Sequence, residues 1–122
     1  RWVIATLREA NNLVERIGSP QVGVIVDAYH VWWDADVYDE IARCGRNILG
    51  FHVSDWIVPL PDVLLGRGMM GDGFIELRRL RTAVDAAGYD GPIEVEIFNQ
   101  AIWDAPGDEV LALMCRRFLE HV

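Results

Sequence analysis

The amino-acid sequence predicts an α/β fold in which three parallel strands alternate with helices. Three short apolar runs, at 22–26, 48–53 and 93–98, have the length and composition of strands in a parallel sheet. Each run is followed by a stretch in which apolar residues recur at helical spacing. This alternation is typical of parallel strands joined by right-handed crossovers. We therefore expect the order helix, then strand and helix three times over.

An amphipathic helix is expected at the start of the chain. Gly18 is placed to end this helix, and Pro20 closes it off. The strand over 22–26 follows, with apolar residues on both of its faces. The residues that share one side of the first helix are Val3, Ile4, Leu7, Ala10, Asn11, Val14 and Ile17.

The second helix and the second strand repeat this order. Asp34 or Asp36 can cap a helix that ends at Gly45. The strand over 48–53 follows, and a connection rich in proline and glycine then runs from 54 to about 73. Connections of this length inside a compact domain are usually lids or binding segments. The inward residues of the second helix are Val37, Ile41 and Cys44.

Two further helices complete the pattern. The third helix ends at Gly88, and a turn at 89–92 leads into the strand over 93–98. The last helix starts near Pro106, which is acceptable in a first turn. The apolar sides of these helices are formed by Leu77, Leu80, Val84 and Ala87, and by Val110, Leu111, Met114, Phe118 and Val122.

Three parallel strands are too few to cover both faces of their own sheet. A barrel of eight such units needs about 250 residues, so we expect residues 1–122 to form the C-terminal part of a (β/α)8 TIM barrel. The chain begins at Arg1 inside a helical pattern, and we expect it to be cut from a longer protein.

Charge and composition exclude several classes of protein. Eleven basic against nineteen acidic residues give a formal charge of −8, which disfavours nucleic acid as a partner. No apolar run approaches the roughly 20 residues of a membrane span, and no signal peptide opens the chain. We therefore expect a soluble cytoplasmic protein. Cys44 and Cys115 lie in predicted helices among apolar neighbours, and we expect free buried thiols.

Polar side chains occur at or near the carboxyl end of each predicted strand. Asp27 follows the first strand, His52 lies in the second and Glu96 in the third. Active sites of α/β folds lie at the carboxyl ends of the strands, so closing the sheet would bring these side chains together. Mixed Asp, Glu and His ligands suit Mn²⁺, Mg²⁺ or Zn²⁺. The pattern predicts a site for a divalent metal ion.

Each of these residues also has a purely structural interpretation. Asp27 taken alone is best interpreted as a capping or turn residue, and His52 is as readily a core histidine as a ligand. Glu94 and Glu96 share one face of their strand. Two carboxylates facing a barrel interior are costly unless they are paired, protonated or metal-bound. For this pair the functional interpretation is favoured.

The surroundings of the predicted site offer further candidates. His30 can touch a substrate hydroxyl or pack on aromatic rings, and Arg67 is the only cation between 54 and 73. The glycines at 66, 68 and 71 lack a strand directly before them, which argues against a phosphate-binding loop. The tryptophans that follow strand ends can wall a pocket for a sugar-sized ligand or pack at its rim; they are Trp32, Trp33, Trp56 and Trp103.

Four stretches in order resemble the xylose isomerase-like TIM-barrel superfamily, and more narrowly its sugar phosphate isomerase/epimerase family. They are VDAYH at 26–30, FHVSD at 51–55, Arg67 with GDG at 71–73, and GYDGPIEVE at 88–96. The resemblance covers essentially the whole chain and makes its strands the sixth to the eighth of the barrel.

The resemblance implies one divalent metal ion, often manganese, held by Asp27, His52 and Glu96. A first glutamate ligand belongs to a strand that would precede Arg1. In this family the metal polarises the carbonyl and hydroxyl of a ketose, and two glutamates move a proton through an enediolate. Glu96 matches one of these two bases.

The resemblance also assigns roles around the metal. His30 and Arg67 match positions that contact substrate oxygens, and Asp55 matches an acid near the metal. Gly66 stands where the family has an aspartate before the arginine. Trp32 and Trp56 are then candidates for the pocket wall.

These observations lead to two functional hypotheses. The first is a divalent-metal-dependent isomerase or epimerase that acts on a sugar, sugar phosphate or polyol, and dehydratase chemistry is compatible with the same site. The second is a non-catalytic barrel fragment that pairs with itself or with a complementary half through exposed sheet edges. A DNA-repair endonuclease of the same superfamily is disfavoured by the acidic charge.

Overall fold

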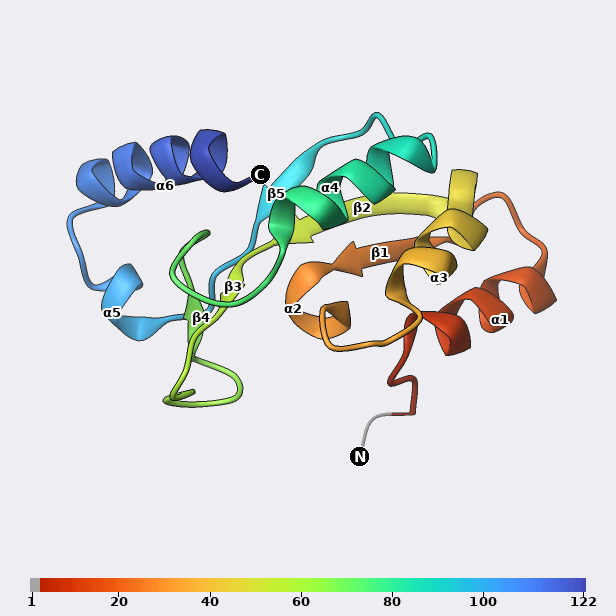
Figure 1. Ribbon diagram of the computed structural model, residues 1–122, viewed down its shortest axis with the longest axis horizontal. Helices are drawn as coiled ribbons and strands as arrows, with labels where there is room; N and C mark the ends of the chain where they lie inside the picture. Colours follow the sequence, from red (N-terminus) through yellow and green to blue (C-terminus); the bar gives the residue numbers. More distant parts are fainter. Residues whose placement is uncertain (1–2) are drawn as a thin grey trace.

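A parallel three-stranded sheet forms the centre of the computed structural model, which describes residues 3–122. The strand order is β1–β2–β5, with β1 at Val24–Asp27, β2 at Ile48–Val53 and β5 at Ile93–Val95. Figure 1 shows the strands side by side, with their carboxyl ends at one edge of the sheet. This arrangement confirms the predicted α/β fold with three parallel strands.

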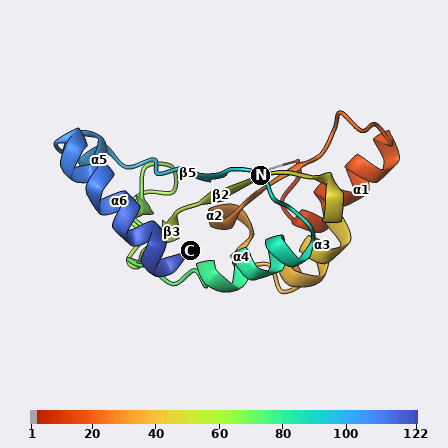
Figure 2. The ribbon, with the colours of Figure 1, turned by 90° about the horizontal axis from the view of Figure 1, so that it is seen from above.

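Helices cover one face of this sheet. The helices α3 (Val37–Cys44) and α4 (Leu77–Ala86) lie on the same side of the strands, and α1 (Leu7–Ile17) lies beside α3 at the β1 edge of the sheet (Figure 2). Val24, Val26, Phe51 and Val53 are buried beneath them. The opposite face carries no helix in residues 3–122. Ile25, which alternates with the buried valines of β1, is 56% exposed there. The sheet is therefore open on the side that would face a barrel interior.

The helix α1 begins later than its apolar pattern predicts. Thr6 caps it: the Thr6 hydroxyl accepts from the Glu9 amide (3.2 Å), and the Glu9 carboxylate accepts from the Thr6 amide (3.1 Å). Val3 and Ile4 therefore lie before the helix, and Val3 is 98% exposed. The helix ends as predicted at Gly18, which has a φ of 62°.

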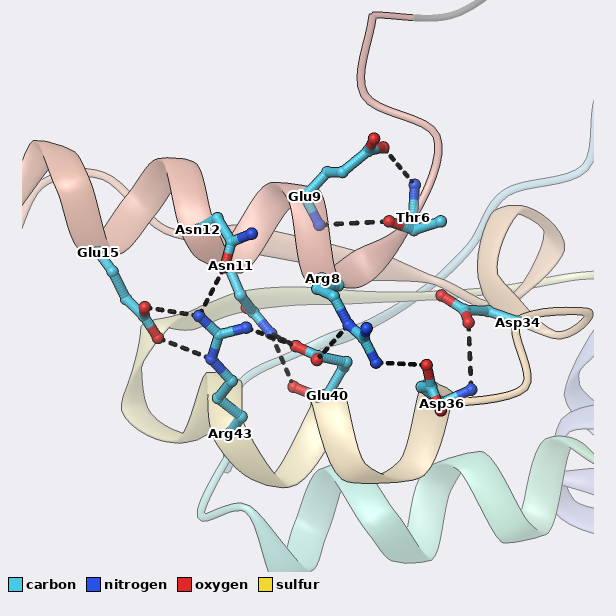
Figure 3. Close-up of polar contacts among 10 residues, drawn as sticks. All are labelled: Thr6, Arg8, Glu9, Asn11, Asn12, Glu15, Asp34, Asp36, Glu40 and Arg43. Atoms are coloured by element: carbon cyan, nitrogen blue, oxygen red, sulfur yellow. Dashed lines mark hydrogen bonds and ion pairs between the residues drawn. The ribbon is translucent and has the colours of Figure 1, made fainter.

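A buried ion-pair network joins α1 to α3 (Figure 3). The Glu40 carboxylate lies between the two helices and accepts from Asn11 Nδ2 (2.9 Å), Arg8 Nε (3.1 Å) and Arg43 Nη1 (3.1 Å). Asn11 Nδ2 also donates to the Glu40 backbone carbonyl (2.9 Å). Arg43 continues the network to Glu15 at the surface (2.6 Å). These contacts fix α1 against α3.

The connection from 54 to 73, for which no strand was predicted, contains two strands. β3 (Asp55–Trp56) and β4 (Arg67–Gly68) pair antiparallel, with Trp56 opposite Arg67. Strands of two residues are too short to produce a recognisable alternation of apolar and polar residues, so the sequence did not reveal them. The segment is a hairpin whose two ends are held together.

Two further short helices, one directly after β1 and one shortly after β5, were also not predicted. In α2 (Ala28–Val31) the first turn is capped by Asp27, whose Oδ1 accepts from the Tyr29 amide (2.9 Å). In α5 (Gln100–Trp103) Asn99 Oδ1 accepts from the Ala101 amide (3.0 Å). Each begins with an Asp or Asn cap. A single turn of helix is too short to add an apolar pattern to that cap, so the sequence did not reveal it.

The last helix, α6 (Gly107–His121), starts after Pro106 as predicted. It lies beside β5, and its carboxyl end reaches α4 through a hydrogen bond from Arg78 to the Glu120 carbonyl. Cys44 is buried as expected, but Cys115 is exposed, so the prediction of two buried thiols is wrong for α6. Within residues 3–122, no helix combines the length and the apolar character that crossing a membrane requires.

Candidate metal centre

Asp27, His52 and Glu96 come together at the carboxyl edge of the sheet. Asp27 ends β1 and lies opposite His52 of β2 in the strand register. Glu96 follows β5, and its amide donates to the Val53 carbonyl (3.0 Å), which continues the β2–β5 pairing by one residue. One possible ligand atom from each of the three side chains lies within 4.8 Å of the others. The strand register thus creates the cluster.

The three side chains fit a divalent metal ion. His52 Nδ1 is 3.6 Å from Glu96 Oε2, so this ring nitrogen faces the carboxylates. An ion about 2.0–2.2 Å from each ligand atom requires those atoms to lie within about 4.4 Å of one another. The observed limit of 4.8 Å is close to that spacing. One imidazole and two carboxylates form a donor set that accepts Mn²⁺, Mg²⁺ or Zn²⁺.

Arg67 of β4 reaches into the same cluster. Its Nη1 lies 3.0 Å from Asp27 Oδ2 and 2.8 Å from Glu96 Oε2, and its Nη2 lies 3.2 Å from His30 Nε2. The residue is only 5% exposed. It is therefore a buried member of the site and not a solvated loop residue. His30 itself lies 3.6 Å from Asp27 Oδ2.

Aromatic rings and backbone contacts fix Arg67 in place. Its guanidinium carbon is 4.6 Å from the Tyr29 ring centroid and 5.1 Å from that of Phe98. The Arg67 amide donates to the Phe98 carbonyl (3.3 Å), and Asn99 Nδ2 donates to the Arg67 carbonyl (3.0 Å). A side chain at Gly66 would collide with the Asp62 carbonyl, 2.2 Å from its Cβ. The hairpin is thus anchored from the segment after β5, without an aspartate before the arginine.

The two carboxylates of the cluster differ in their affinity for protons. Burial raises the pKa of Asp27 and outweighs the opposing charges of Arg67 and His30. Burial also acts to raise the pKa of Glu96, but the charge of Arg67, then a hydrogen bond with Asp27 and the contacts with His52, outweigh it and lower that pKa. Glu96 is therefore the more readily ionised of the pair.

Asp55 supports the hairpin from below the cluster. Its Oδ1 accepts from the Ile75 amide (3.0 Å), and its Oδ2 accepts from the amides of Gly71 and Gly73 (2.9 Å each). A Cβ on Gly73 would lie 2.2 Å from the Trp56 carbonyl, so this turn requires glycine. The carboxylate of Asp55 holds the loop that follows β4.

The candidate aromatic residues divide between the cluster and the surface. The Trp56 ring lies 4.9 Å from Tyr29 and 5.7 Å from Trp32, between ring centroids, and these rings extend the wall beside Arg67. Trp103 donates to the Ile97 carbonyl (3.0 Å) and remains half exposed, as does Trp33. Tyr29, Phe98 and Asn99 were not singled out from the sequence, although Asn99 directly follows the predicted strand over 93–98.

Glu94 differs from Glu96 although both lie on one face of the strand. It is 69% exposed in its side chain, and its Oε2 is 3.8 Å from His52 Nε2, the ring nitrogen that faces away from Glu96. Glu96 is more buried and is held by Arg67. Of the two glutamates, only Glu96 belongs to the three-residue cluster.

Comparisons with known proteins agree with this architecture. The family model for the xylose isomerase-like TIM barrel matches residues 1–117. Protein SMc04130 from Sinorhizobium meliloti 1021 has a structure that superposes with a TM-score of 0.93 at 45% identity, over 97% of this chain and 44% of that one. The predicted partial barrel is confirmed.

Two characterised relatives differ in their reactions. A ketose 3-epimerase from Arthrobacter globiformis is 25% identical over 101 residues, which are 82% of this chain and 32% of that protein. A 3-dehydroshikimate dehydratase from Pseudomonas aeruginosa is 30% identical over 108 residues, which are 84% of this chain and 17% of that protein. The chain thus spans a third or less of these relatives. It belongs to the xylose isomerase-like TIM barrel family.

Proposed function

We propose that this chain supplies three metal ligands and one catalytic base of a divalent-metal-dependent isomerase or epimerase. The substrate would be a sugar, a sugar phosphate or a polyol. The observation that carries the proposal is the convergence of Asp27, His52 and Glu96 at the carboxyl edge of the sheet. Similarity to a ketose 3-epimerase supports the reaction class.

The metal ligands would be Asp27, His52 and Glu96, with Mn²⁺ the first candidate and Mg²⁺ or Zn²⁺ the others. When bound, such an ion polarises a carbonyl and a neighbouring hydroxyl of a substrate. Glu96, whose pKa is lowered, is ionised at neutral pH and is suited to take the proton from the carbon beside the carbonyl. His30 and Arg67 would bind substrate oxygens. Return of the proton on the other face needs a second acid–base group besides Glu96.

Metal binding is the direct test, and Glu94 provides a matched control. Isothermal titration of the chain with Mn²⁺ should show one site. Glu96→Ala should weaken binding by at least about tenfold, because one of three ligands is lost. Glu94→Ala removes the same charge from the same strand face but no ligand atom, so it should weaken binding clearly less than Glu96→Ala does. Equal binding by wild type and Glu96→Ala would rule out the site.

The reaction class is tested separately by solvent exchange. In D₂O with Mn²⁺, the chain should introduce deuterium at the carbon beside a ketose carbonyl, because this half-reaction needs only one base. Proton NMR of a ketose panel, with 3-dehydroshikimate included, detects the exchange and any loss of water. Exchange on 3-dehydroshikimate alone would favour a dehydratase, the reaction of the relative from Pseudomonas aeruginosa.

A second candidate is a barrel fragment that associates with another copy or with a complementary half. The open face of the sheet at Ile25 favours it, as does an apolar groove between β5 and α6, lined by Val95, Met114, Phe118 and Leu119. Sedimentation velocity distinguishes the states. A compact monomer over the micromolar range would contradict this candidate.

A further inference from the structure

Arg67 holds the same carboxylate oxygens that a metal ion would need. Asp27 Oδ1 caps α2 by accepting from the Tyr29 amide (2.9 Å). The other oxygen, Oδ2, accepts from Arg67 Nη1 (3.0 Å). In Glu96 the oxygen nearest His52 Nδ1 is Oε2, and it accepts from the same Nη1 (2.8 Å). One nitrogen therefore bridges both acidic ligands.

Charge makes this bridge relevant to the metal. Asp27 and Glu96 are two acidic groups bound to one guanidinium nitrogen, with 11% and 34% of their side chains exposed, so water screens their mutual repulsion only in part. The guanidinium supplies a single positive charge against them. A divalent ion between the same oxygens would face that charge a few ångströms away, which is unfavourable in a poorly solvated site. Arg67 and the ion are thus competitors for the two carboxylates.

The Arg67 guanidinium also has contacts that do not depend on the two carboxylates. The backbone of Arg67 is fixed by Phe98 and Asn99, so a change of contacts involves the side chain alone. The rings of Tyr29 and Phe98 lie 4.6 and 5.1 Å from the guanidinium carbon and attract it wherever Nη1 points. Nη2 lies beside His30 Nε2, toward the residue proposed to contact substrate.

We propose that Arg67 is a built-in counter-cation of the metal centre, which holds Asp27 and Glu96 together in the metal-free chain and is displaced from them by the ion. Displacement leaves Nη1 free for an oxygen of the substrate, so the arginine contacts substrate only after the metal is in place. The inference rests on the metal site described under Proposed function and goes beyond it by coupling that site to Arg67.

Calorimetric titration with Mn²⁺ tests this coupling. Arg67→Met keeps an apolar side chain against Tyr29 and removes the competing charge, so Mn²⁺ should bind at least about tenfold more tightly than to wild type. The matched control is Arg79→Met, since Arg79 is also stacked on a ring (4.0 Å from the Tyr38 centroid) and paired with a glutamate, but lies outside the cluster. This control should change the Mn²⁺ affinity by less than about twofold.

A measurement on the wild-type chain covers the case in which Arg67→Met does not fold. In ¹⁵N NMR of the guanidinium groups, saturation with Mg²⁺ should shift the Arg67 signals and leave those of Arg79 in place. If the Arg67 signals stay unchanged at saturation, the displacement of Arg67 by the ion is refuted while the metal site stands. Unchanged or weaker Mn²⁺ binding by folded Arg67→Met would refute it in the same way. If the wild-type chain binds neither Mn²⁺ nor Mg²⁺, the proposed function is refuted, and so is the displacement of Arg67 by a metal ion.

Discussion

Asn11→Ala should destabilise the chain by about 3 kcal/mol. Asn11 is buried between α1 and α3 and donates two hydrogen bonds of 2.9 Å, one to the Glu40 carbonyl and one to the Glu40 carboxylate. A bond to a neutral acceptor contributes about 1 kcal/mol and a bond to an ionised one about 1.5–3 kcal/mol. Alanine removes both hydrogen bonds, and the Glu40 carboxylate then keeps only those from Arg8 and Arg43.

Urea unfolding followed by far-UV circular dichroism measures the change, and the neighbouring residue is the control. Asn12 lies one position along the same helix and accepts a single surface hydrogen bond from Arg43 (2.7 Å). Asn12→Ala should therefore cost less than about 0.5 kcal/mol. Equal costs for the two variants would refute the assignment of Glu40 as the buried centre of the network.

The pH dependence provides an independent check on the same pair. The hydrogen bond from Asn11, followed by those from Arg8 and Arg43, lowers the pKa of Glu40 from its ordinary value of 4.5, although burial acts in the opposite direction. A depressed pKa contributes stability above the unfolded value and loses it as the pH falls through the folded value. The gap between wild type and Asn11→Ala should therefore narrow below about pH 4.5. A gap that stays constant to pH 3 would contradict the electrostatic part of the reasoning.

Two further predictions concern the hairpin and the thiols. Asp55→Asn replaces one accepting oxygen by an NH₂ group that faces backbone amides. It should lower the free energy of unfolding in urea by about 2–4 kcal/mol and make the turn at 71–73 sensitive to protease. A variant as stable and as resistant as wild type would contradict the role of Asp55. Burial raises the pKa of Cys44 to about 11, whereas Cys115 is exposed. Ellman's reagent at pH 8 should therefore modify one thiol in the native chain and two in urea, and rapid reaction of both native thiols would show that Cys44 is accessible.

The elements long enough to show a repeated apolar pattern were predictable from the sequence, and the elements of two to four residues were not. The strand at Ile48–Val53 and the helix that ends before Gly45 lie where the pattern places them, because each buries a continuous face. β3 and β4 have two residues each, and the carboxylate of Asp55 in β3 holds the loop after β4 by accepting from amides 16 to 20 residues further on. No local pattern reports such a partner.

The candidate site was predictable as a set of residues and not as a set of contacts. The topology of parallel strands is enough to bring Asp27, His52 and Glu96 to one edge. The double use of Asp27, which caps a helix through one oxygen and meets Arg67 through the other, combines two interpretations that looked exclusive in the sequence. The pairing with Arg67 depends on a hairpin that brings a residue 40 positions away to the cluster.

The way the hairpin is anchored separates its tip from its base. Arg67 is held by Asn99, and the loop after β4 is held by Asp55, whereas the tip reaches the site through the Val63 carbonyl, which accepts from the Tyr29 hydroxyl (3.2 Å). Val63 and Leu64 project from this tip and are exposed, while Asp62 closes a local turn by accepting from the Leu64 amide (2.8 Å). Loops fixed at their base tolerate insertion and exchange. For the function proposed above, libraries that vary the exposed side chains of Val63 and Leu64 should alter which ligands are admitted, which makes these two positions a place to graft new selectivity onto this scaffold.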